Sequence, residues 1–320
     1  MKKHPFFVLM TFAVALTAAS CSQPKDLRLM YWNIANGMWD GQTDHYDRFV
    51  AYVKSWKPDI CVWTEAQTIY VTGTETECDT ADRYLVKHWD ELAARYGHKC
   101  VYVGGHRDDY PQVITSRFPI ENVARIVGAE PDSVVVHGAG WARIRFAGKT
   151  LNIVTMHNYP FDYSYGVPKG QRDSSMAVRG GDRYRAIETE YVCRHTIGTD
   201  PDAAAGYWML LGDFNSFSPL DIATNPYYKW KESDPRFLAQ SYVLKKTPFI
   251  DIVREKHPAE MLSTWLTWQR IDYVYCTKPL SDRVVRADII KDEYANPVRD
   301  PDFDFYHPSD HQPILVDFRF

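Results

Sequence analysis

The sequence has no apolar run long enough to cross a membrane and no cysteine pattern typical of a structural metal site. The run from Phe6 to Ala19 covers about 14 residues, whereas a membrane-spanning helix needs roughly 20. None of the six cysteines forms a Cys-x-x-Cys pair or a Cys/His spacing typical of zinc. Internal repeats and low-complexity segments are also absent. These absences exclude a multi-span membrane protein, a zinc ribbon and a repeat protein.

The N-terminal apolar run instead has the features of an export signal. Lys2 and Lys3 precede it, and it ends in Ala18-Ala19-Ser20-Cys21. This ending resembles a bacterial lipobox, so we expect residues 1–20 to be a signal peptide that is cleaved before Cys21, which then receives a lipid. Simple secretion and a retained anchor are the alternatives. The protein is therefore expected at the cell envelope, in the outer membrane or at the surface, or else in the periplasm or outside the cell.

Positive charge is scarce in the chain that would remain after cleavage. Residues 1–20 contain two lysines and no acidic residue, so the remainder carries 35 basic and 41 acidic residues, a formal charge of −6. Proteins that bind duplex nucleic acid usually have an excess of lysine and arginine. The sequence thus permits nucleic acid as a partner without favouring it, and it implies no obligate protein partner.

Residues 27–320 predict a single domain, because no change of composition marks a boundary within them. Helices at intervals with many strands between them suggest two sheets packed face to face, with helices outside. The predicted helices are 44–56, about 83–96 and 182–197, the last with Asp182 as its N-cap. The predicted strands are 28–34, 60–63, 99–103, 112–115, 120–127, 133–136, 141–146, 150–156, 207–211, 271–276, 284–290 and 313–318, with irregular segments at 158–181 and 214–270.

Polar side chains occur at the ends of several predicted strands. Such side chains gather at one rim of a sheet, where α/β enzymes usually place their sites. We therefore expect them to form one site. The residues are Asn33, Glu65, His157, Asp213, Asn215, Asp272, Asp310 and His311.

These residues lie in motifs that resemble those of the endonuclease/exonuclease/phosphatase superfamily, which includes pancreatic deoxyribonuclease, neutral sphingomyelinases and inositol-polyphosphate 5-phosphatases. The resemblance covers nearly the whole chain after residue 26, in the family's order. Gly212-Asp213-Phe214-Asn215, followed about 95 residues later by Ser309-Asp310-His311, is the most specific combination. The other matching segments are Trp32-Asn33-Ile34, Glu65, Ser116-Arg117-Phe118-Pro119-Ile120, Thr155-Met156-His157 and Arg270-Ile271-Asp272-Tyr273.

The resemblance implies an α+β fold, a four-layer α/β/β/α sandwich of two mixed, mainly antiparallel sheets with outer helices. It also implies a hydrolase of phosphate esters that uses one or two Mg²⁺ or Mn²⁺ ions. Glu65 would bind the metal, since hard oxygen ligands suit Mg²⁺. Asn33 and Asp310 would complete the surroundings of the metal, directly or through water.

The same resemblance assigns catalytic roles. Asp213 would orient or deprotonate the attacking water, and Asn215 would donate to a phosphate oxygen. Asp272 matches the carboxylate that the family pairs with its last histidine, here His311, and such a carboxylate fixes the tautomer and raises the pKa of the imidazole. His157 would contact phosphate or assist the leaving group. The sequence leaves open which of Asp213 and His311 accepts the proton.

Each of these residues also has a purely structural interpretation. Asn33 could be an ordinary turn residue, and Glu65 could cap the segment that follows it. Asp213 and Asn215 could form an Asx turn, and His157 could be a structural histidine at a strand end. All of these coincidences would have to occur together in family order, which favours a catalytic site.

Two departures from the family pattern concern the substrate. The apurinic-site nucleases of the superfamily typically carry Tyr where this chain has His157, which points toward the deoxyribonuclease, sphingomyelinase or phosphatase branches. Before Ser116, members commonly have a Gly-containing segment, whereas this chain has Tyr110-Pro111-Gln112. The contacts of that loop therefore do not follow from the resemblance.

Basic and aromatic residues are frequent between residues 158 and 185, directly after His157. Such residues grip phosphorylated ligands and stack on bases or sugars. We predict that Tyr159, Arg179 and Arg183 bind substrate, with a solvated surface loop as the alternative. The acidic and aromatic segment 300–306 is expected to form an opposite wall, which would repel a long polyanion.

The sequence therefore predicts a metal-dependent phosphodiesterase or phosphatase that acts on small or lipid-linked phosphate esters at the cell envelope. An extracellular endonuclease acting on DNA or RNA is the main alternative. A catalytically degenerate binding module is a third, and it would be marked by the loss of Glu65, Asp213 or His311, all of which are present.

Overall fold

The computed structural model describes most of the chain after residue 24. The predictions for the signal peptide 1–20, for Cys21 and for the segment 300–306 lie outside the described residues. Among the helices that are described, none combines the length and the apolar composition that a membrane crossing requires. The described ranges are 25–35, 46–67, 89–104, 110–126, 134–265, 268–295 and 309–320.

One sheet contains both ends of the described chain. Its strands, in spatial order, are β11 (Val284–Ile289), β12 (Ile314–Arg319), β1 (Asp26–Asn33), β2 (Ile60–Thr64), β4 (Val113–Ser116) and β3 (Cys100–Val103). β1 pairs in parallel with β2 and antiparallel with β12. β1 and β2 are apolar and buried almost throughout, because both faces of this sheet are covered.

The second sheet carries the middle of the chain. Its strands, in spatial order, are β5 (Ile120–Ile126), β6 (Ala139–Phe146), β7 (Lys149–His157), β8 (Tyr207–Asp213), β10 (Asp272–Thr277) and β9 (Phe249–Asp251). β7 and β8 are parallel, whereas the other neighbours pair antiparallel. Both sheets are thus mixed and mainly antiparallel, as predicted.

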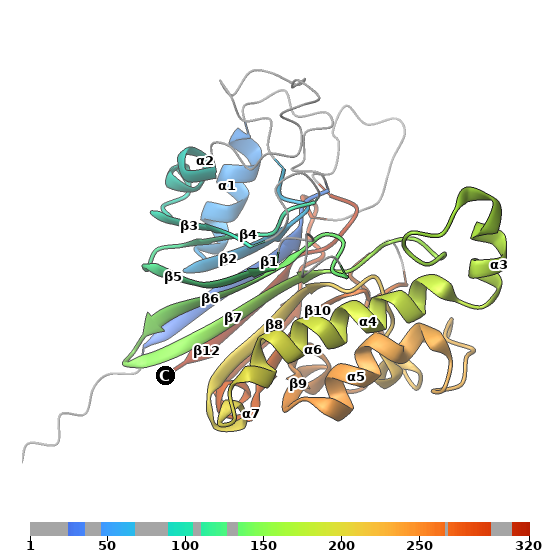
Figure 1. The fold of residues 1–320 in the computed structure, drawn as a ribbon. Coiled ribbons are helices and arrows are strands. Elements are labelled where there is room, and N and C mark those ends of the chain that lie inside the picture. The colour runs from blue at the N-terminus through green and yellow to red at the C-terminus, as the bar shows by residue number, and fades with distance from the viewer. Residues whose placement is uncertain are drawn as a thin grey trace, which may run out of the picture.

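The two sheets pack face to face, and helices cover their outer faces (Figure 1). α1 (Asp47–Trp56) and α2 (Trp89–Arg95) cover the first sheet, and α4 (Gly180–His195) and α5 (Leu238–Lys246) cover the second. The structure therefore confirms the four-layer α/β/β/α sandwich. The remaining helices are α3 (Arg172–Ala177), α6 (Ile252–Lys256) and α7 (Lys278–Ser281), with 3₁₀ turns at Lys169–Gln171, Ile197–Thr199, Ala203–Ala205, Pro219–Asp221 and Pro235–Phe237.

The two segments that were expected to be irregular contain regular structure. Residues 158–181 include α3, which lies in an arm that projects from the body of the protein (Figure 1). Residues 214–270 include α5, β9 and α6. These elements have three to nine residues and little apolar periodicity, so packing rather than local pattern determines them.

The predicted N-cap of the long helix was wrong. α4 begins at Gly180, and Arg179 occupies the N-cap position with a φ of 58°. A side chain at Gly181 would place its Cβ 2.0 Å from the carbonyl oxygen of Phe161, so the helix can start here only because this residue is glycine. Asp182 lies in the first turn, where its carboxylate pairs with Arg179 at 2.5 Å.

One predicted strand, residues 133–136, is also wrong over its described part, because residues 134–136 form no strand. The Val136 N–H donates instead to the Glu188 carboxylate on α4, at 3.0 Å. The carboxylate of Glu188, more than 50 residues further along the chain, thus accepts the backbone hydrogen bond that a neighbouring strand would otherwise accept.

The parallel strand pairs fix the edge at which a site can form. β1 and β2 both end at this edge, as do β7 and β8. At the opposite edge, the Lys25 N–H donates to the carbonyl oxygen of Phe320 at 3.0 Å, so both ends of the described chain lie there. The eight residues of β1 separate the two edges by about 23 Å.

Candidate active site

The ends of strands from both sheets bring polar side chains together. Asn33 ends β1, and Glu65 directly follows β2. His157 and Asp213 end the neighbouring strands β7 and β8 and lie opposite each other in register. Asp213 also lies opposite Asp272, the first residue of β10. Both sheets therefore contribute side chains to one site.

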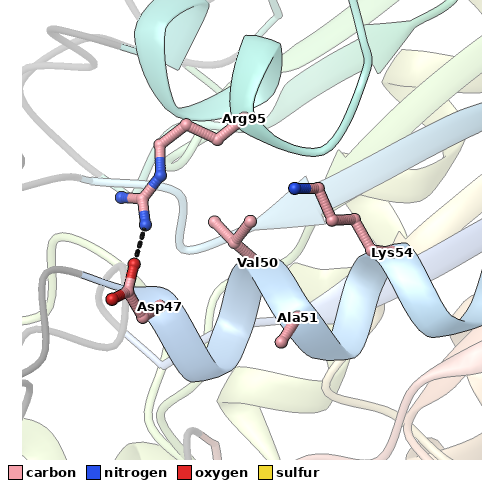
Figure 2. Close-up of a pocket in the computed structure, with 5 residues that line it drawn as sticks. All are labelled: Asp47, Val50, Ala51, Lys54 and Arg95. Carbon is pink, nitrogen blue, oxygen red and sulfur yellow. Dashed lines mark hydrogen bonds and ion pairs between the residues drawn. The ribbon is translucent and has the colours of Figure 1, made fainter.

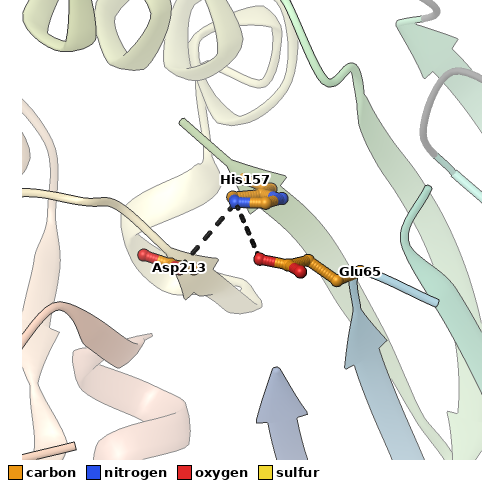
Figure 3. A group of neighbouring side chains, drawn as sticks. All are labelled: Glu65, His157 and Asp213. Atoms are coloured by element: carbon orange, nitrogen blue, oxygen red, sulfur yellow. Dashed lines mark ion pairs between the residues drawn. The ribbon is translucent and has the colours of Figure 1, made fainter. Parts of the chain in front are cut away.

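Glu65, His157 and Asp213 form the centre of this site (Figure 3). His157 Nε2 lies 3.9 Å from Glu65 Oε1 and 3.8 Å from Asp213 Oδ2. Burial lowers the pKa of His157 well below its ordinary value, and the neighbouring His137 and His311 lower it further. The imidazole is therefore neutral at physiological pH and has a lone pair available on one ring nitrogen.

Asn33 links the two carboxylates of this group across the sheets. Its Nδ2 donates to Glu65 Oε1 at 3.1 Å and to Asp213 Oδ2 at 3.0 Å. Glu65 has a φ of 52°, an uncommon conformation for a residue other than glycine. Such backbone conformations are retained where the surrounding structure holds them, often at functional sites.

A buried histidine–carboxylate pair lies on the other side of Asp213. His311 Nδ1 donates to Asp272 Oδ2 at 2.8 Å, and the Tyr31 hydroxyl donates to Asp272 Oδ1 at 2.6 Å. Burial alone would lower the pKa of His311, but Asp272, Asp213 and Asp310 outweigh it and raise the pKa to about 10. His311 is therefore a buried cation at neutral pH, with Nε2 3.8 Å from Asp213 Oδ2.

Asp213 thus lies between the neutral imidazole of His157 and the charged imidazole of His311. Burial raises its pKa well above the ordinary value and Asp272 raises it further, while His311 and the backbone N–H of Asn215 oppose this effect. That N–H donates to Asp213 Oδ1 at 2.8 Å. The Asn215 side-chain amide donates to the Asn158 carbonyl at 2.9 Å, so the turn after β8 is tied to the end of β7.

The central group has the chemistry of a divalent-metal site. The ligand atoms of Glu65, His157 and Asp213 lie within 4.8 Å of one another, and so do those of Asp213, Asp272 and His311. In the first group, two carboxylates offer the oxygen ligands that Mg²⁺ and Mn²⁺ prefer, and a neutral imidazole offers a lone pair. In the second group His311 is charged and hydrogen-bonded to Asp272, which makes this group less suited to a cation.

Asp310 lies beside this centre rather than within it. It belongs to neither group of potential metal ligands among the described residues. Its Oδ2 accepts a hydrogen bond from Trp265 Nε1 at 2.9 Å, and its Oδ1 lies 3.9 Å from His311 Nε2. The geometry thus places Asp310 next to His311.

Comparison with known structures shows the same fold in an endonuclease, a 3′ phosphatase and TDP2. An apurinic endonuclease from Archaeoglobus fulgidus is 17% identical, with a TM-score of 0.59 over 91% of this chain and 99% of that protein. The 3′ phosphatase NExo from Neisseria, bound to a product DNA hairpin, is 17% identical, with a TM-score of 0.58 over 92% and 100%. A humanised zebrafish (D. rerio) TDP2 is 14% identical, with a TM-score of 0.53 over 92% and 98%. No curated protein matches the sequence significantly.

The sequence profile of the endonuclease/exonuclease/phosphatase family matches residues 30–311. The chain belongs to this family. This match confirms the predicted family, and the similar structures confirm the predicted fold. Members of the family are metal-dependent hydrolases of phosphate esters, which also confirms the predicted general class of enzyme. The match begins just before Asn33 and ends at His311, and it therefore spans all of the predicted metal and catalytic residues.

The three predicted substrate-binding residues of this family member are not part of the converging group. Tyr159 is buried, and its ring packs against Phe161 and Tyr184. Arg179 pairs with Asp182, and Arg183 Nε donates to the Val178 carbonyl at 3.1 Å. In this structure all three side chains hold the arm and α4 in place.

His137 packs directly against the site, although no motif in the sequence indicated it. The His137 ring stacks on His157 with 4.6 Å between centroids and 28° between planes. Tyr110 meets His137 edge-on at 4.7 Å and His157 at 6.0 Å. His137 directly follows the predicted strand 133–136, but it lies in none of the family motifs, so the sequence gave no reason to single it out. Tyr110 was noted only as a departure from the family pattern.

Arg270, in the family motif before Asp272, has a structural role. Its guanidinium group is 1% exposed and binds the carboxylates of Asp221 and Asp251 at 2.7 to 3.1 Å. Arg254 adds a second guanidinium on Asp221 at 2.6 Å. This buried cluster anchors the start of β10, on which Asp272 lies.

A shallow surface pocket lies away from this chemistry, between α1 and α2 (Figure 2). Asp47 and Arg95 form an ion pair across it, and Lys54 is the other charged group in its lining. Its walls contain no histidine and no pair of carboxylates. We therefore assign no catalytic role to this pocket.

Proposed function

We propose that this protein hydrolyses phosphate esters with Mg²⁺ or Mn²⁺, as a phosphodiesterase or phosphatase acting on small substrates at the cell envelope. The observation that carries the proposal is the arrangement around Asp213. This carboxylate lies between a neutral histidine in a metal-type group and a protonated histidine in a carboxylate pair. A cation site, a base and a proton donor at one place suit metal-assisted hydrolysis of phosphate esters.

Glu65, His157 and Asp213 would hold the metal, with Asn33 orienting the two carboxylates. When bound, the metal shields the charge of the phosphate oxygens and stabilises the charge that develops in an in-line displacement. His157 was predicted to contact phosphate, and its position between Glu65 and Asp213 supports metal binding as well.

Asp213 and His311 would divide the proton chemistry. With a pKa raised to about 10, His311 carries its proton at neutral pH, so it donates to a phosphate oxygen and does not act as the base. Asp213 would orient the attacking water and accept its proton beside the bound metal, whose charge lowers the pKa of that water. Asp272 and the Tyr31 hydroxyl hold the imidazole of His311 in place.

The position of the chain ends favours soluble substrates. A lipid on Cys21 would lie only four residues before Lys25, at the edge opposite the site. With Cys21 lipidated as proposed, the length of β1 would separate the site from the anchored end of the domain by about 23 Å. Such a separation favours water-soluble phosphate esters over lipids of the same membrane as substrates.

An endonuclease acting on DNA or RNA is the second candidate. The similarity of the fold to an apurinic endonuclease and to a DNA-bound 3′ phosphatase supports it. The formal charge of −6 without residues 1–20 weighs against a long polyanion as substrate.

A panel of substrates tests these proposals on the chain without residues 1–20. It contains sugar phosphates, bis-p-nitrophenyl phosphate, phospholipid vesicles, and single- and double-stranded DNA and RNA, each with Mg²⁺, Mn²⁺ or EDTA. We expect metal-dependent hydrolysis of small esters that is abolished in Asp213→Asn. Preferential cleavage of nucleic acid would favour the second candidate, and a lack of hydrolysis of every ester would leave a binding module.

A further inference from the structure

Trp265 lies in the loop before β10 and reaches across to Asp310. Its indole Nε1 donates to Asp310 Oδ2 at 2.9 Å. The backbone of Trp265 also forms an isolated antiparallel bridge with His311, and the two rings lie 6.4 Å apart. Trp265 is thus fixed beside the same residues whose side chains enter the site.

The preceding residue, Thr264, anchors this contact on both sides. Its Oγ1 accepts hydrogen bonds from the backbone N–H groups of Ile271 and Asp272, both at 3.1 Å. Its carbonyl oxygen accepts the Gln312 N–H at 2.8 Å. The Thr264–Trp265 segment therefore ties the start of β10 to the chain that carries Asp310 and His311.

The indole restricts a carboxylate that would otherwise rotate. The Asp310 side chain is 29% exposed, so water competes for both of its oxygens. Binding of Oδ2 to the indole leaves Oδ1 directed toward His311 Nε2, 3.9 Å away. A hydrogen bond to a charged group is stronger than one between neutral groups, so it can hold this orientation.

We propose that Trp265 is a positioning residue that orients the Asp310 carboxylate for its work in the site. This inference rests on the proposed function, because it requires a metal held by Glu65, His157 and Asp213. Asp310 lies outside that group and would support the metal through water. Partners that orient a ligand in this way typically change metal affinity about 10–100-fold when they are removed.

The test uses Mn²⁺ alone as the probe, with binding measured by electron paramagnetic resonance. Trp265→Phe keeps an aromatic ring but removes the N–H donor, and we expect it to weaken Mn²⁺ binding about tenfold or more. In an Asp310→Ala background the same substitution should have almost no further effect, because the side chain that accepts the indole hydrogen bond is absent. Equal effects in both backgrounds, or unchanged affinity in Trp265→Phe, would overturn the proposal.

Trp268→Phe is the matched control, since it removes an indole from the same loop but leaves the Asp310 contact intact. It should retain wild-type Mn²⁺ affinity. If Trp265→Phe does not fold, the indole N–H resonance of Trp265 supplies a second measurement, in wild type and in Asp310→Ala. A shift of that resonance between the two supports the contact, and identical resonances contradict it.

The two proposals can fail separately. Mn²⁺ binding that depends on Trp265 and Asp310 in a protein that hydrolyses no ester would contradict the proposed function and retain the positioning role. Hydrolysis of esters by Trp265→Phe with wild-type metal dependence would contradict the positioning role of Trp265 and retain the proposed function.

Discussion

Replacing Asp272 by Asn should release the proton that His311 holds at neutral pH. In the wild type, Asp272, Asp213 and Asp310 overcome the effect of burial and raise the pKa of His311 from 6.5 to about 10. This difference corresponds to on the order of 5 kcal/mol in favour of the charged imidazolium. Asp272 lies closest, at 2.8 Å from His311 Nδ1, so most of this preference should disappear in Asp272→Asn.

The assay is an NMR titration of the His311 Cε1 proton, assigned by its absence in His311→Gln. We expect the wild-type imidazole to stay charged up to about pH 10 and the Asp272→Asn imidazole to titrate near or below 6.5. Asp310→Asn is the control, because its carboxylate lies 3.9 Å from Nε2 and should change the pKa less. A wild-type His311 that titrates near 6.5, or equal pKa values in wild type and Asp272→Asn, would refute this reasoning.

The pair of His311 and Asp272 also makes the stability and the activity of the protein depend on pH. Because the pKa of His311 is raised in the folded protein, the stabilisation is complete below pH 6.5 and is lost as pH rises toward 10. Asp272→Asn should lack this loss, which denaturant titrations at several pH values would show. At pH 8 its turnover should fall about 10²–10⁴-fold, since the neutral imidazole no longer donates a proton.

Three further outcomes are expected. Glu65→Gln should require about tenfold more Mg²⁺ for half-maximal activity and recover partly at high metal, whereas an unchanged Mg²⁺ titration would argue against Glu65 as a ligand. Arg270→Met should lower the free energy of unfolding by about 3–5 kcal/mol, because Asp221 and Asp251 would remain buried without their cation, and a loss below about 1 kcal/mol by urea denaturation would contradict this. Labelling with a fatty-acid analogue in the native host should mark the wild type but not Cys21→Ala, and equally low labelling of both would favour simple secretion.

Much of the fold could be predicted because its central strands are locally encoded. β2 and most of β8 are continuous apolar runs, and β1 and β7 are mainly apolar in their central parts. The structure confirms each within one or two residues. The elements between residues 214 and 270 were missed because they are short and depend on packing against α4 and the second sheet. The start of α4 was misplaced because Gly180 and Gly181, rather than a capping side chain, allow close approach of the chain before it.

The sequence by itself determined the residue types of the site and their order, since strand-end motifs such as Gly212-Asp213-Phe214-Asn215 are contiguous. Only the tertiary structure decided which of them meet. The contact between Asn33 and Asp213 joins residues 180 positions apart, and that between Trp265 and Asp310 joins residues 45 apart. No periodicity in the sequence encodes such contacts, because they form only when the two sheets pack. The same packing buries both imidazoles. Burial and the neighbouring histidines lower the pKa of His157 and keep it neutral, whereas the carboxylates around His311 raise its pKa and keep it charged.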